Sequence, residues 1–176
     1  TMPKQLLKII SEKTMTEETI DRIRSICSDG VKPLIVTGRA IADSMKAVLP
    51  PSLQYDLIVE PVGKNTAPAV ALAAKWIESK YGDSTMLVLS ADHDIRPVDR
   101  FIDAVKTAVD LADNDKCLAV FGIKPSRPET GYGYIELKEL IAEKGTSRCY
   151  IVKQFVEKPD SQTARKFLDS GNYMWN

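Results

Sequence analysis

Apolar and polar residues alternate along this chain in blocks that predict strands followed by helices. Short apolar runs, typical of buried strands, occupy residues 33–37, 56–60, 86–89 and 117–122. Apolar residues at helical spacing and an alanine-rich stretch predict helices over residues 40–49, 67–80 and 98–111. This order of elements favours an α/β fold whose mostly parallel, Rossmann-like sheet is flanked by helices.

The two ends of the chain depart from this alternation. Near the start, Thr14 precedes acidic residues and isoleucines at helical spacing, which predicts a capped helix that ends at a turn near residues 29–30. Near the end, residues 132–137 and 149–156 are two extended segments separated by a charged stretch, and they predict an antiparallel extension near the C-terminus. Residues 161–168 predict a short final helix.

The composition indicates one core and no strong electrostatic partner. Of the 176 residues, 44% are hydrophobic, and the 24 Lys and Arg residues equal the 24 Asp and Glu residues, so net charge does not favour nucleic acid or an anionic membrane. No apolar run approaches the roughly 18 residues that cross a bilayer. We therefore expect neither nucleic acid nor a membrane as a partner. The cysteines are typical of reduced thiols in a cytoplasmic protein, because they lack a C-x-x-C pair and are widely spaced: Cys27, Cys117 and Cys149.

The apolar run at residues 87–89 ends at a pair of carboxylates, Asp92 and Asp94, on either side of the only histidine. Parallel sheets bind ligands just beyond the carboxyl ends of their strands. Asp92 is therefore a candidate to hold a divalent cation beside a phosphate, since such cations prefer oxygen ligands. The alternative is that Asp92 or Asp94 caps the helix that follows.

A second candidate segment is the loop of residues 60–68, which leads into a predicted helix. Asn65 and Thr66 precede that helix, whose free backbone N–H groups could bind an anion or a base edge. The alternative is a well-capped helix with Pro68 in its first turn.

Two later segments could contact a ligand as well. Residues 124–134 contain two prolines and two glycines, which would let the backbone approach a sugar ring closely, or would make the loop a rigid connector. Glu157 and Lys158 end an extended segment beside a proline, where they could bind hydroxyls and a phosphate or could simply be a solvated strand end.

Taken in order, these segments resemble the sugar-nucleotide pyrophosphorylases, a nucleotidyltransferase family, and within it the bacterial mannose-1-phosphate guanylyltransferases. The most discriminating strings are Asn-Thr-Ala-Pro-Ala at residues 65–69 and Glu-Thr-Gly-Tyr-Gly-Tyr-Ile at residues 129–135. The matching pieces span nearly the whole chain and lie at residues 3–5, 60–69, 89–93, 121–125, 128–135, 155–160 and 171–176.

The resemblance implies a nucleotide-diphospho-sugar transferase type of fold and a reaction of GTP with mannose 1-phosphate that gives GDP-mannose and pyrophosphate. It implies Mg²⁺ as the cofactor, held by Asp92, and it implies catalytic roles for Asp92 and Lys4. The nucleotide-binding residues that it implies are Lys4, Lys64, Asn65, Thr66, Ala67, Ala91 and Asp92. The residues implied around the sugar phosphate are Tyr132, Gly133, Glu157, Lys158 and Asn176. Many relatives carry arginine in place of Lys64, so the charge is kept but the bidentate fork is lost.

The resemblance further implies one incomplete domain over residues 1–176, with residues 1–122 binding the nucleotide and residues 123–176 binding the sugar phosphate. The family's glycine-rich loop, G-G-x-G-x-R-L-x-P, would lie before Pro3, and a second metal-binding aspartate would lie after Asn176. We therefore expect a fragment that is inactive alone and belongs to an active parent. Two alternatives remain, a related enzyme for another nucleotide or hexose and a regulatory subunit that binds without catalysis. The sequence does not decide the oligomeric state, for which a homodimer is one option.

Overall fold

The computed structural model describes residues 2–27 and 30–176. The chain forms two compact units, of which the first ends at Val98 and the second begins at Asp99. The two sheets are separate, one parallel sheet of two strands in the first unit and one antiparallel sheet of three strands in the second. The predicted α/β class is confirmed, with both a parallel sheet and an antiparallel sheet near the C-terminus.

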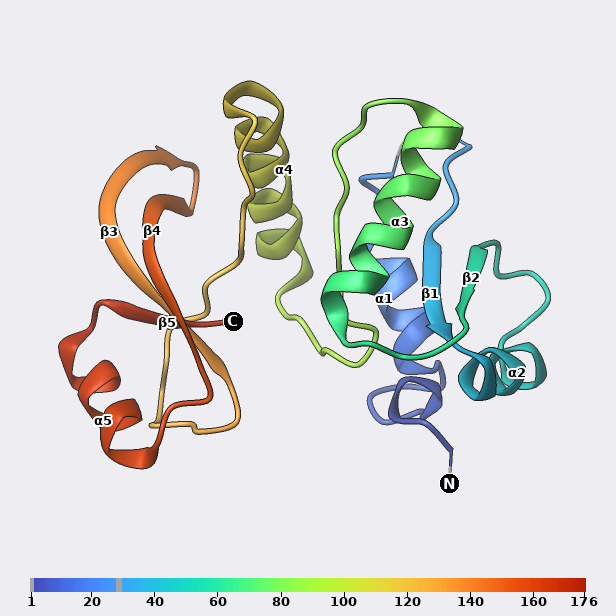
Figure 1. Cartoon of the computed structure of the whole chain (residues 1–176), viewed down its shortest axis with the longest axis horizontal. Coiled ribbons are helices and arrows are strands. Elements are labelled where there is room, and N and C mark those ends of the chain that lie inside the picture. Colours follow the sequence, from blue (N-terminus) through green and yellow to red (C-terminus); the bar gives the residue numbers. More distant parts are fainter. Residues whose placement is uncertain (1, 28–29) are drawn as a thin grey trace. The chain divides into compact units, whose positions relative to one another are not determined.

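The first unit is built around two parallel strands, β1 and β2. Its elements follow in the order η1 (Lys4–Leu6), α1 (Met15–Ile23), β1 (Leu34–Gly38), α2 (Arg39–Val48), β2 (Asp56–Glu60) and α3 (Thr66–Tyr81). The strands pair from Leu34↔Asp56 to Gly38↔Glu60, and α2 and α3 pack against β1 (Figure 1). Leu6, Met45 and Leu49 form a buried cluster, which anchors η1 against α2.

Helix α1 begins with the predicted threonine cap, which the structure shows to be a capping box. The Thr14 side chain accepts the Glu17 N–H at 3.2 Å, and the Glu17 carboxylate accepts the Thr14 N–H at 2.9 Å. The helix ends at Ile23, so the prediction that it continues to residues 29–30 is wrong in length. The N–H groups of Arg24 and Ile26 donate to carbonyls three residues back, which tightens the chain into turns. Asp29, part of the predicted stop, lies outside the described residues.

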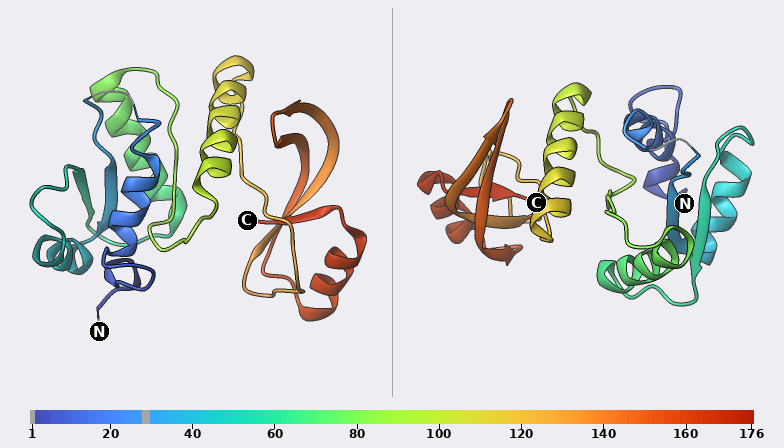
Figure 2. Two further views of the ribbon diagram at one scale, coloured as in Figure 1. Left: turned by 180° about the vertical axis from the view of Figure 1, so that it is seen from behind. Right: turned by 90° about the horizontal axis from the view of Figure 1, so that it is seen from above.

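The second unit contains the long hairpin β3–β4. Its elements are α4 (Val98–Asp115), which starts at the last residue of the first unit, β3 (Gly133–Lys144), β4 (Ser147–Glu157), α5 (Ser161–Ser170) and β5 (Tyr173–Trp175). The strand order is β4–β3–β5, and all pairs are antiparallel. Figure 2 shows the hairpin as a long twisted ribbon, with α5 next to β5. Tyr134, Ile135 and Ala164 are fully buried in this unit.

Two predicted strands are absent from the structure. Residues 86–89 and 117–122 lie in irregular backbone, and only Ile123, just after the second run, makes a bridge, to Trp175. Both runs are partly exposed, with Val88 half exposed and Leu118 fully exposed. An apolar run predicts that a segment is extended but does not supply a neighbouring strand with free N–H and C=O groups. The parallel sheet is therefore smaller than the sequence pattern predicts.

No helix among the described residues is both long and apolar enough to cross a membrane.

Candidate functional site

The five residues expected around the sugar phosphate lie together in the second unit. Because neighbouring strands are antiparallel, β3 begins at the edge of the sheet where β4 and β5 end. Gly133 starts β3 and pairs with Glu157, the last residue of β4, while Asn176 directly follows β5. Tyr132 and Lys158 are the residues just outside the Gly133–Glu157 pair. One sheet edge therefore presents all five residues.

Backbone hydrogen bonds hold this edge in place. The Asn176 N–H donates to the Gly133 carbonyl at 2.9 Å, and the Lys158 N–H donates to the Tyr132 carbonyl at 3.2 Å. The Asn176 side-chain amide donates to the Phe121 carbonyl at 3.1 Å. These three hydrogen bonds fix the backbone around the candidate sugar-phosphate residues, while the side chains of Tyr132, Glu157 and Lys158 stay exposed.

Gly133 is a position where only a glycine fits without rearrangement. A Cβ added there would lie 2.4 Å from Phe155 Cζ and 3.2 Å from Glu157 Oε2. Gly133 is itself buried, and the space that its missing side chain leaves is next to the Glu157 carboxylate. The close approach of a sugar ring to this backbone stays a prediction, and the atoms that lie close to Gly133 in the structure are side chains of Phe155 and Glu157.

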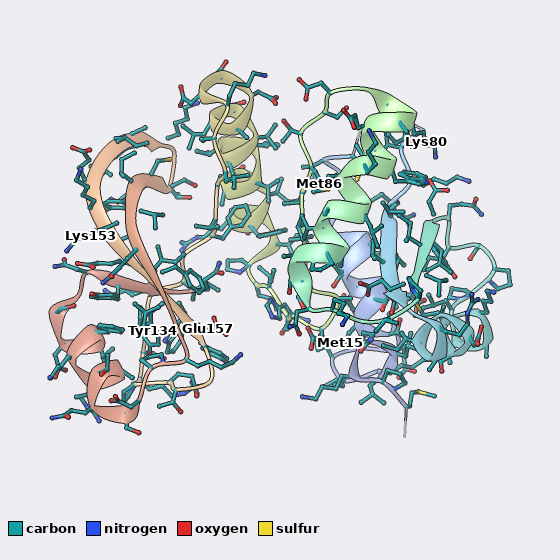
Figure 3. All side chains as sticks on the ribbon, in the orientation of Figure 1. Met15, Lys80, Met86, Tyr134, Lys153 and Glu157 are labelled. Carbon is teal, nitrogen blue, oxygen red and sulfur yellow. The ribbon has the colours of Figure 1, made fainter. Side chains whose placement is uncertain are left out.

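Glu157 and Lys158 form an ion pair, with Lys158 Nζ 2.7 Å from Glu157 Oε1. Both side chains are more than half exposed, so the pair contributes little to stability and can open toward a ligand. Lys158 has φ +44°, a left-handed conformation that is uncommon for a residue with a side chain. Figure 3 shows Glu157 near Tyr134 at the same end of the hairpin, whereas Lys153, which comes earlier in β4, lies away from that end.

Three residues that the sequence interpretation did not single out lie against this edge: Arg127, Glu129 and Trp175. The Trp175 ring lies 5.4 Å from the Tyr132 ring in an edge-to-face contact, and the Arg127 guanidinium lies 5.4 Å from the same indole. Trp175 Nε1 is buried and has no hydrogen-bond partner among the described residues. Glu129 binds Arg127 and the Gly131 N–H. The sequence signals for this group were the proline- and glycine-rich loop, which holds Arg127 and Glu129, and the matching pieces at residues 128–135 and 171–176, which hold Glu129 and Trp175.

In the first unit, the candidate nucleotide-binding residues 64–67 lie at the start of α3. Asn65 is the N-cap residue, but its φ is +65° and its side chain makes no capping hydrogen bond. All four residues are exposed. The alternative of a well-capped helix is therefore wrong, and the first-turn N–H groups of this helix are left without a side-chain acceptor at the N-cap.

The turn with Ala91 and Asp92 is anchored from α1. Ser90 Oγ donates to Asp92 Oδ1 at 2.5 Å, and Arg22 Nη2 donates to the His93 carbonyl at 3.0 Å. Arg22 is only 7% exposed, and its burial lowers the pKa of the guanidinium, an effect that nearby Asp94 opposes. Arg22 is a further residue that the sequence interpretation did not single out, because nothing in α1 pointed to a partner 71 residues away.

The capping alternative for this turn is also wrong. Helix α4 begins at Val98, beyond the reach of either carboxylate as a cap. Asp94 instead accepts a hydrogen bond from Arg96 Nε at 3.0 Å. Asp92 remains an exposed carboxylate on an anchored turn.

The described residues contain no group of three or more His, Cys, Asp or Glu side chains that could hold a metal ion by themselves. Mg²⁺ commonly uses only one or two carboxylates and completes its shell with water and substrate phosphates. Asp92, exposed and oriented by Ser90, fits a site of that kind. The donor set is therefore compatible with Mg²⁺ that is bound together with a nucleotide.

Lys4 lies in η1, where its side chain is exposed. Its segment is tied to α1, because Thr16 Oγ1 donates to the Gln5 carbonyl at 2.9 Å. Among the described residues, no hydrogen bond or ion pair joins the side chain of Lys4 to residues 64–67 or to Asp92. The structure thus places the candidate nucleotide-binding residues on three separate segments of the first unit.

The comparison with protein families covers the whole chain. The family model for "Nucleotidyl transferase" matches residues 1–176. The chain belongs to the nucleotidyl transferase family. The resemblance seen in the sequence motifs is therefore confirmed at the level of the family, and so is the assignment to the transferases.

Among curated nucleotidyl transferases, a mannose-1-phosphate guanylyltransferase of Escherichia coli is 39% identical to the chain, over 99% of the chain and 36% of that protein. A mannose-1-phosphate guanylyltransferase of Salmonella montevideo is 40% identical, over 99% of the chain and 37% of that protein. The chain thus spans little more than a third of the length of these relatives.

Two solved structures resemble the chain over 99% of its length. The first, described as a mannose-1-phosphate geranyltransferase from Thermus thermophilus, has a TM-score of 0.81 and 31% identity, with 48% of that chain covered. The second, described as a mannose-6-phosphate isomerase from Helicobacter pylori, has a TM-score of 0.74 and 29% identity, with 63% of that chain covered. Both likenesses extend over the two units of this nucleotidyl transferase.

Proposed function

We propose that the protein containing this chain transfers a guanylyl group from GTP to mannose 1-phosphate, giving GDP-mannose and pyrophosphate. The observation that carries the proposal is the gathering of Tyr132, Gly133, Glu157, Lys158 and Asn176 at one edge of the β4–β3–β5 sheet. The choice of GTP and mannose 1-phosphate rests on the relatives, which are mannose-1-phosphate guanylyltransferases matched over 99% of the chain.

The exposed groups at this edge suit a sugar phosphate. The Lys158 ammonium supplies a positive charge for the phosphate, and the Glu157 carboxylate beside it can accept hydrogen bonds from sugar hydroxyls. A phosphate arriving at Lys158 would replace an exposed ion pair whose net stabilisation is small. Replacement of Glu157 by a phosphate as the partner of Lys158 therefore costs little free energy.

The proposed reaction needs alignment and charge neutralisation more than proton transfer. An anionic oxygen of mannose 1-phosphate forms a bond to the α-phosphorus of GTP, and the bond between that phosphorus and the α,β-bridging oxygen breaks, so that pyrophosphate leaves. The attacking oxygen carries no proton, and no general base is required. Positioned charges such as Lys4 and Lys64 would orient the triphosphate and stabilise the charge that develops on it.

We include Mg²⁺ in the proposal, held by Asp92 together with phosphate oxygens. When bound, the cation would neutralise phosphate charge and polarise the reacting phosphorus. Within this chain, Ser90 orients the Asp92 carboxylate and Arg22 holds the backbone of the same turn. The uncapped start of α3 offers backbone N–H groups to the nucleotide.

The test is release of pyrophosphate by the full-length protein, with GTP or ATP and with mannose 1-phosphate or glucose 1-phosphate. The proposal expects release that requires Mg²⁺ and is fastest with GTP and mannose 1-phosphate. Faster release with another pair would point to a related nucleotidyltransferase. Binding of GDP-mannose without release by any pair would favour a regulatory subunit.

A cytoplasmic location and a homodimer complete the proposal. The location is supported by the cysteines, all three of which are free thiols. The homodimer is tested by the molar mass of the purified protein from light scattering.

A further inference from the structure

We propose that Glu129 is a positioning residue for the sugar-phosphate edge: it fixes the loop of residues 127–133 so that Tyr132 and Gly133 are presented in one geometry. This inference rests on the proposed function and deepens it, because Glu129 would govern binding of one of the two substrates. Glu129 belongs to none of the sets expected for substrate contact, and its side chain is directed to the protein's own loop.

The Glu129 carboxylate uses both oxygens within the loop. Oε1 accepts the Gly131 N–H at 3.0 Å, and Oε2 accepts Arg127 Nε at 3.2 Å and Nη2 at 3.0 Å. These contacts lower the pKa of the Glu129 carboxyl, the Gly131 bond first and Arg127 second. The carboxylate therefore bridges the two sides of the turn that leads into β3.

The backbone of Glu129 is fixed as well. Tyr134 donates its hydroxyl to the Glu129 carbonyl at 2.8 Å, and the Tyr134 side chain is completely buried. Tyr134 is the second residue of β3 and pairs with Val156 and Trp175. The buried tyrosine thus fixes the Glu129 backbone to the central strand. The Glu129 carboxylate in turn fixes Gly131, one residue before Tyr132, through the hydrogen bond that it accepts from the Gly131 N–H.

Arg127 connects the same loop to β5. Its guanidinium, held by Glu129, lies 5.4 Å from the Trp175 ring, and the Tyr132 ring contacts that indole edge-on at 5.4 Å. The residue after Trp175 is Asn176, whose N–H donates to the Gly133 carbonyl. Glu129 therefore sits at the start of a contact chain that reaches Tyr132, Gly133 and Asn176.

The loop of residues 127–133 contains one proline and two glycines, and most of its residues are exposed. Without the Glu129 carboxylate, the loop of residues 127–133 would lose its tethers at Gly131 and at Arg127 and would sample more conformations. The expected cost falls on sugar-phosphate binding, because Tyr132 and Gly133 would have to be ordered by the ligand.

The experiment compares Glu129→Ala and Glu129→Gln with wild type in the full-length protein. The matched control is Glu143→Ala. This variant also removes a glutamate from an ion pair, that of Glu143 Oε1 with Arg148 Nε at 3.0 Å, but the pair lies at the far end of the β3–β4 hairpin. The readouts are the KM for each substrate, kcat, and amide hydrogen exchange at residues 131–133.

For Glu129→Ala we expect the KM for mannose 1-phosphate to rise about tenfold, while kcat and the KM for GTP change less than about threefold. Exchange at residues 131–133 should accelerate. Glu129→Gln should recover part of the KM, because its amide oxygen can still accept the Gly131 N–H, and Glu143→Ala should match wild type in every readout.

A wild-type protein that releases no pyrophosphate from GTP and mannose 1-phosphate would contradict the proposed function, and the positioning role with it. An active wild type would separate the two ideas. In that case an unchanged KM for mannose 1-phosphate in Glu129→Ala, or unchanged exchange at residues 131–133, overturns the role of Glu129 alone. An equal rise in both KM values would do the same, because it would indicate a general structural defect.

Discussion

The two units hold their candidate residues in different ways. In the second unit, Gly133, Glu157 and Asn176 lie on paired strand ends and are joined by ladder or backbone hydrogen bonds. In the first unit, Lys4, residues 64–67 and Asp92 lie on three exposed segments, of which the first is tied to α1 by Thr16 and the last by Arg22. A strand ladder thus builds the sugar-phosphate edge, whereas individual side chains such as Arg22 hold the candidate nucleotide-binding segments.

Because of this difference, the two units should respond to substitution in different ways. Strand ends that are joined by ladder hydrogen bonds are held firmly, so changes there should act through fit and packing. An exposed turn depends on one or two anchoring side chains, so changes there should act through local mobility with little effect on global stability.

Asp92→Ala should have the largest effect on activity. Removal of the carboxylate proposed to hold the cation should lower pyrophosphate release by about 100-fold or more, the scale of losing one group that stabilises developing charge. Asp94→Ala is the control, because Asp94 is an equally exposed carboxylate two residues away that pairs with Arg96. Similar losses in both variants, measured under saturating Mg²⁺, would contradict a special role for Asp92.

Gly133→Ala should destabilise the sheet edge. The added Cβ would meet Phe155 and Glu157, and because Phe155 is half exposed and can move, we expect a loss near 1 kcal/mol in the free energy of unfolding. Gly63→Ala is the control, since nothing lies within 4 Å of a Cβ at Gly63. Urea unfolding measures both. A Gly133→Ala protein as stable as Gly63→Ala would show that the edge is less rigid than the ladder suggests.

Arg22→Met should loosen the Asp92 turn without large global cost. The bond to the His93 carbonyl is lost, but so is a buried guanidinium whose Nη1 has no partner among the described residues, and these effects offset each other to within about 1 kcal/mol. Amide exchange at residues 92–94 should accelerate, and Arg24→Met, which changes an exposed arginine at the end of α1 that pairs with Asp21, should not change it. Unchanged amide exchange in Arg22→Met would show that Arg22 does not anchor the Asp92 turn.

Acid should destabilise the second unit before the first. Neighbouring donors lower the pKa of Glu129, Glu136 and Asp160 in the second unit, whereas Glu78 is the one such carboxyl resolved among the described residues of the first. A lowered pKa adds stability above the unfolded-state value, and this stability is lost as the pH falls through the folded-state value. The loss should therefore appear below about pH 4.5, the ordinary glutamate value.

The two tryptophans allow this pH prediction to be measured unit by unit. Trp76 lies in α3 and Trp175 in β5, so Trp175→Phe and Trp76→Phe each leave one fluorescent reporter. As the pH falls, the Trp175 signal should change first. Coincident transitions, or an earlier change at Trp76, would contradict the difference between the units.

The sequence pattern predicted local structure better than pairing. The helices, apart from the length of α1, the threonine cap at Thr14, β1 and β2, and the antiparallel hairpin are confirmed, because caps, periodicity and turn residues act within a few positions. The strands at residues 86–89 and 117–122 are not formed, since pairing depends on a partner that the run itself does not encode.

The candidate site shows the same limit. Motifs identified Tyr132, Gly133, Glu157, Lys158 and Asn176, and the structure places them together, although their individual roles remain predictions. Arg22 and the Arg127–Glu129–Trp175 group were missed. Arg22 with His93 and Arg127 with Trp175 are contacts between distant segments, and the bonds of Glu129 within its loop depend on the loop conformation, neither of which composition and spacing reveal.

The most direct test of the central claim, that the first unit binds the nucleotide and the second binds the sugar phosphate, is a pair of KM measurements. Lys64→Ala should raise the KM for GTP, and Lys158→Ala should raise the KM for mannose 1-phosphate, each by about tenfold, with the other KM nearly unchanged. Each lysine is exposed, so neither variant should unfold the protein. If Lys158→Ala instead raised the KM for GTP, or if both variants raised both KM values equally, the division of binding between the two units would be contradicted.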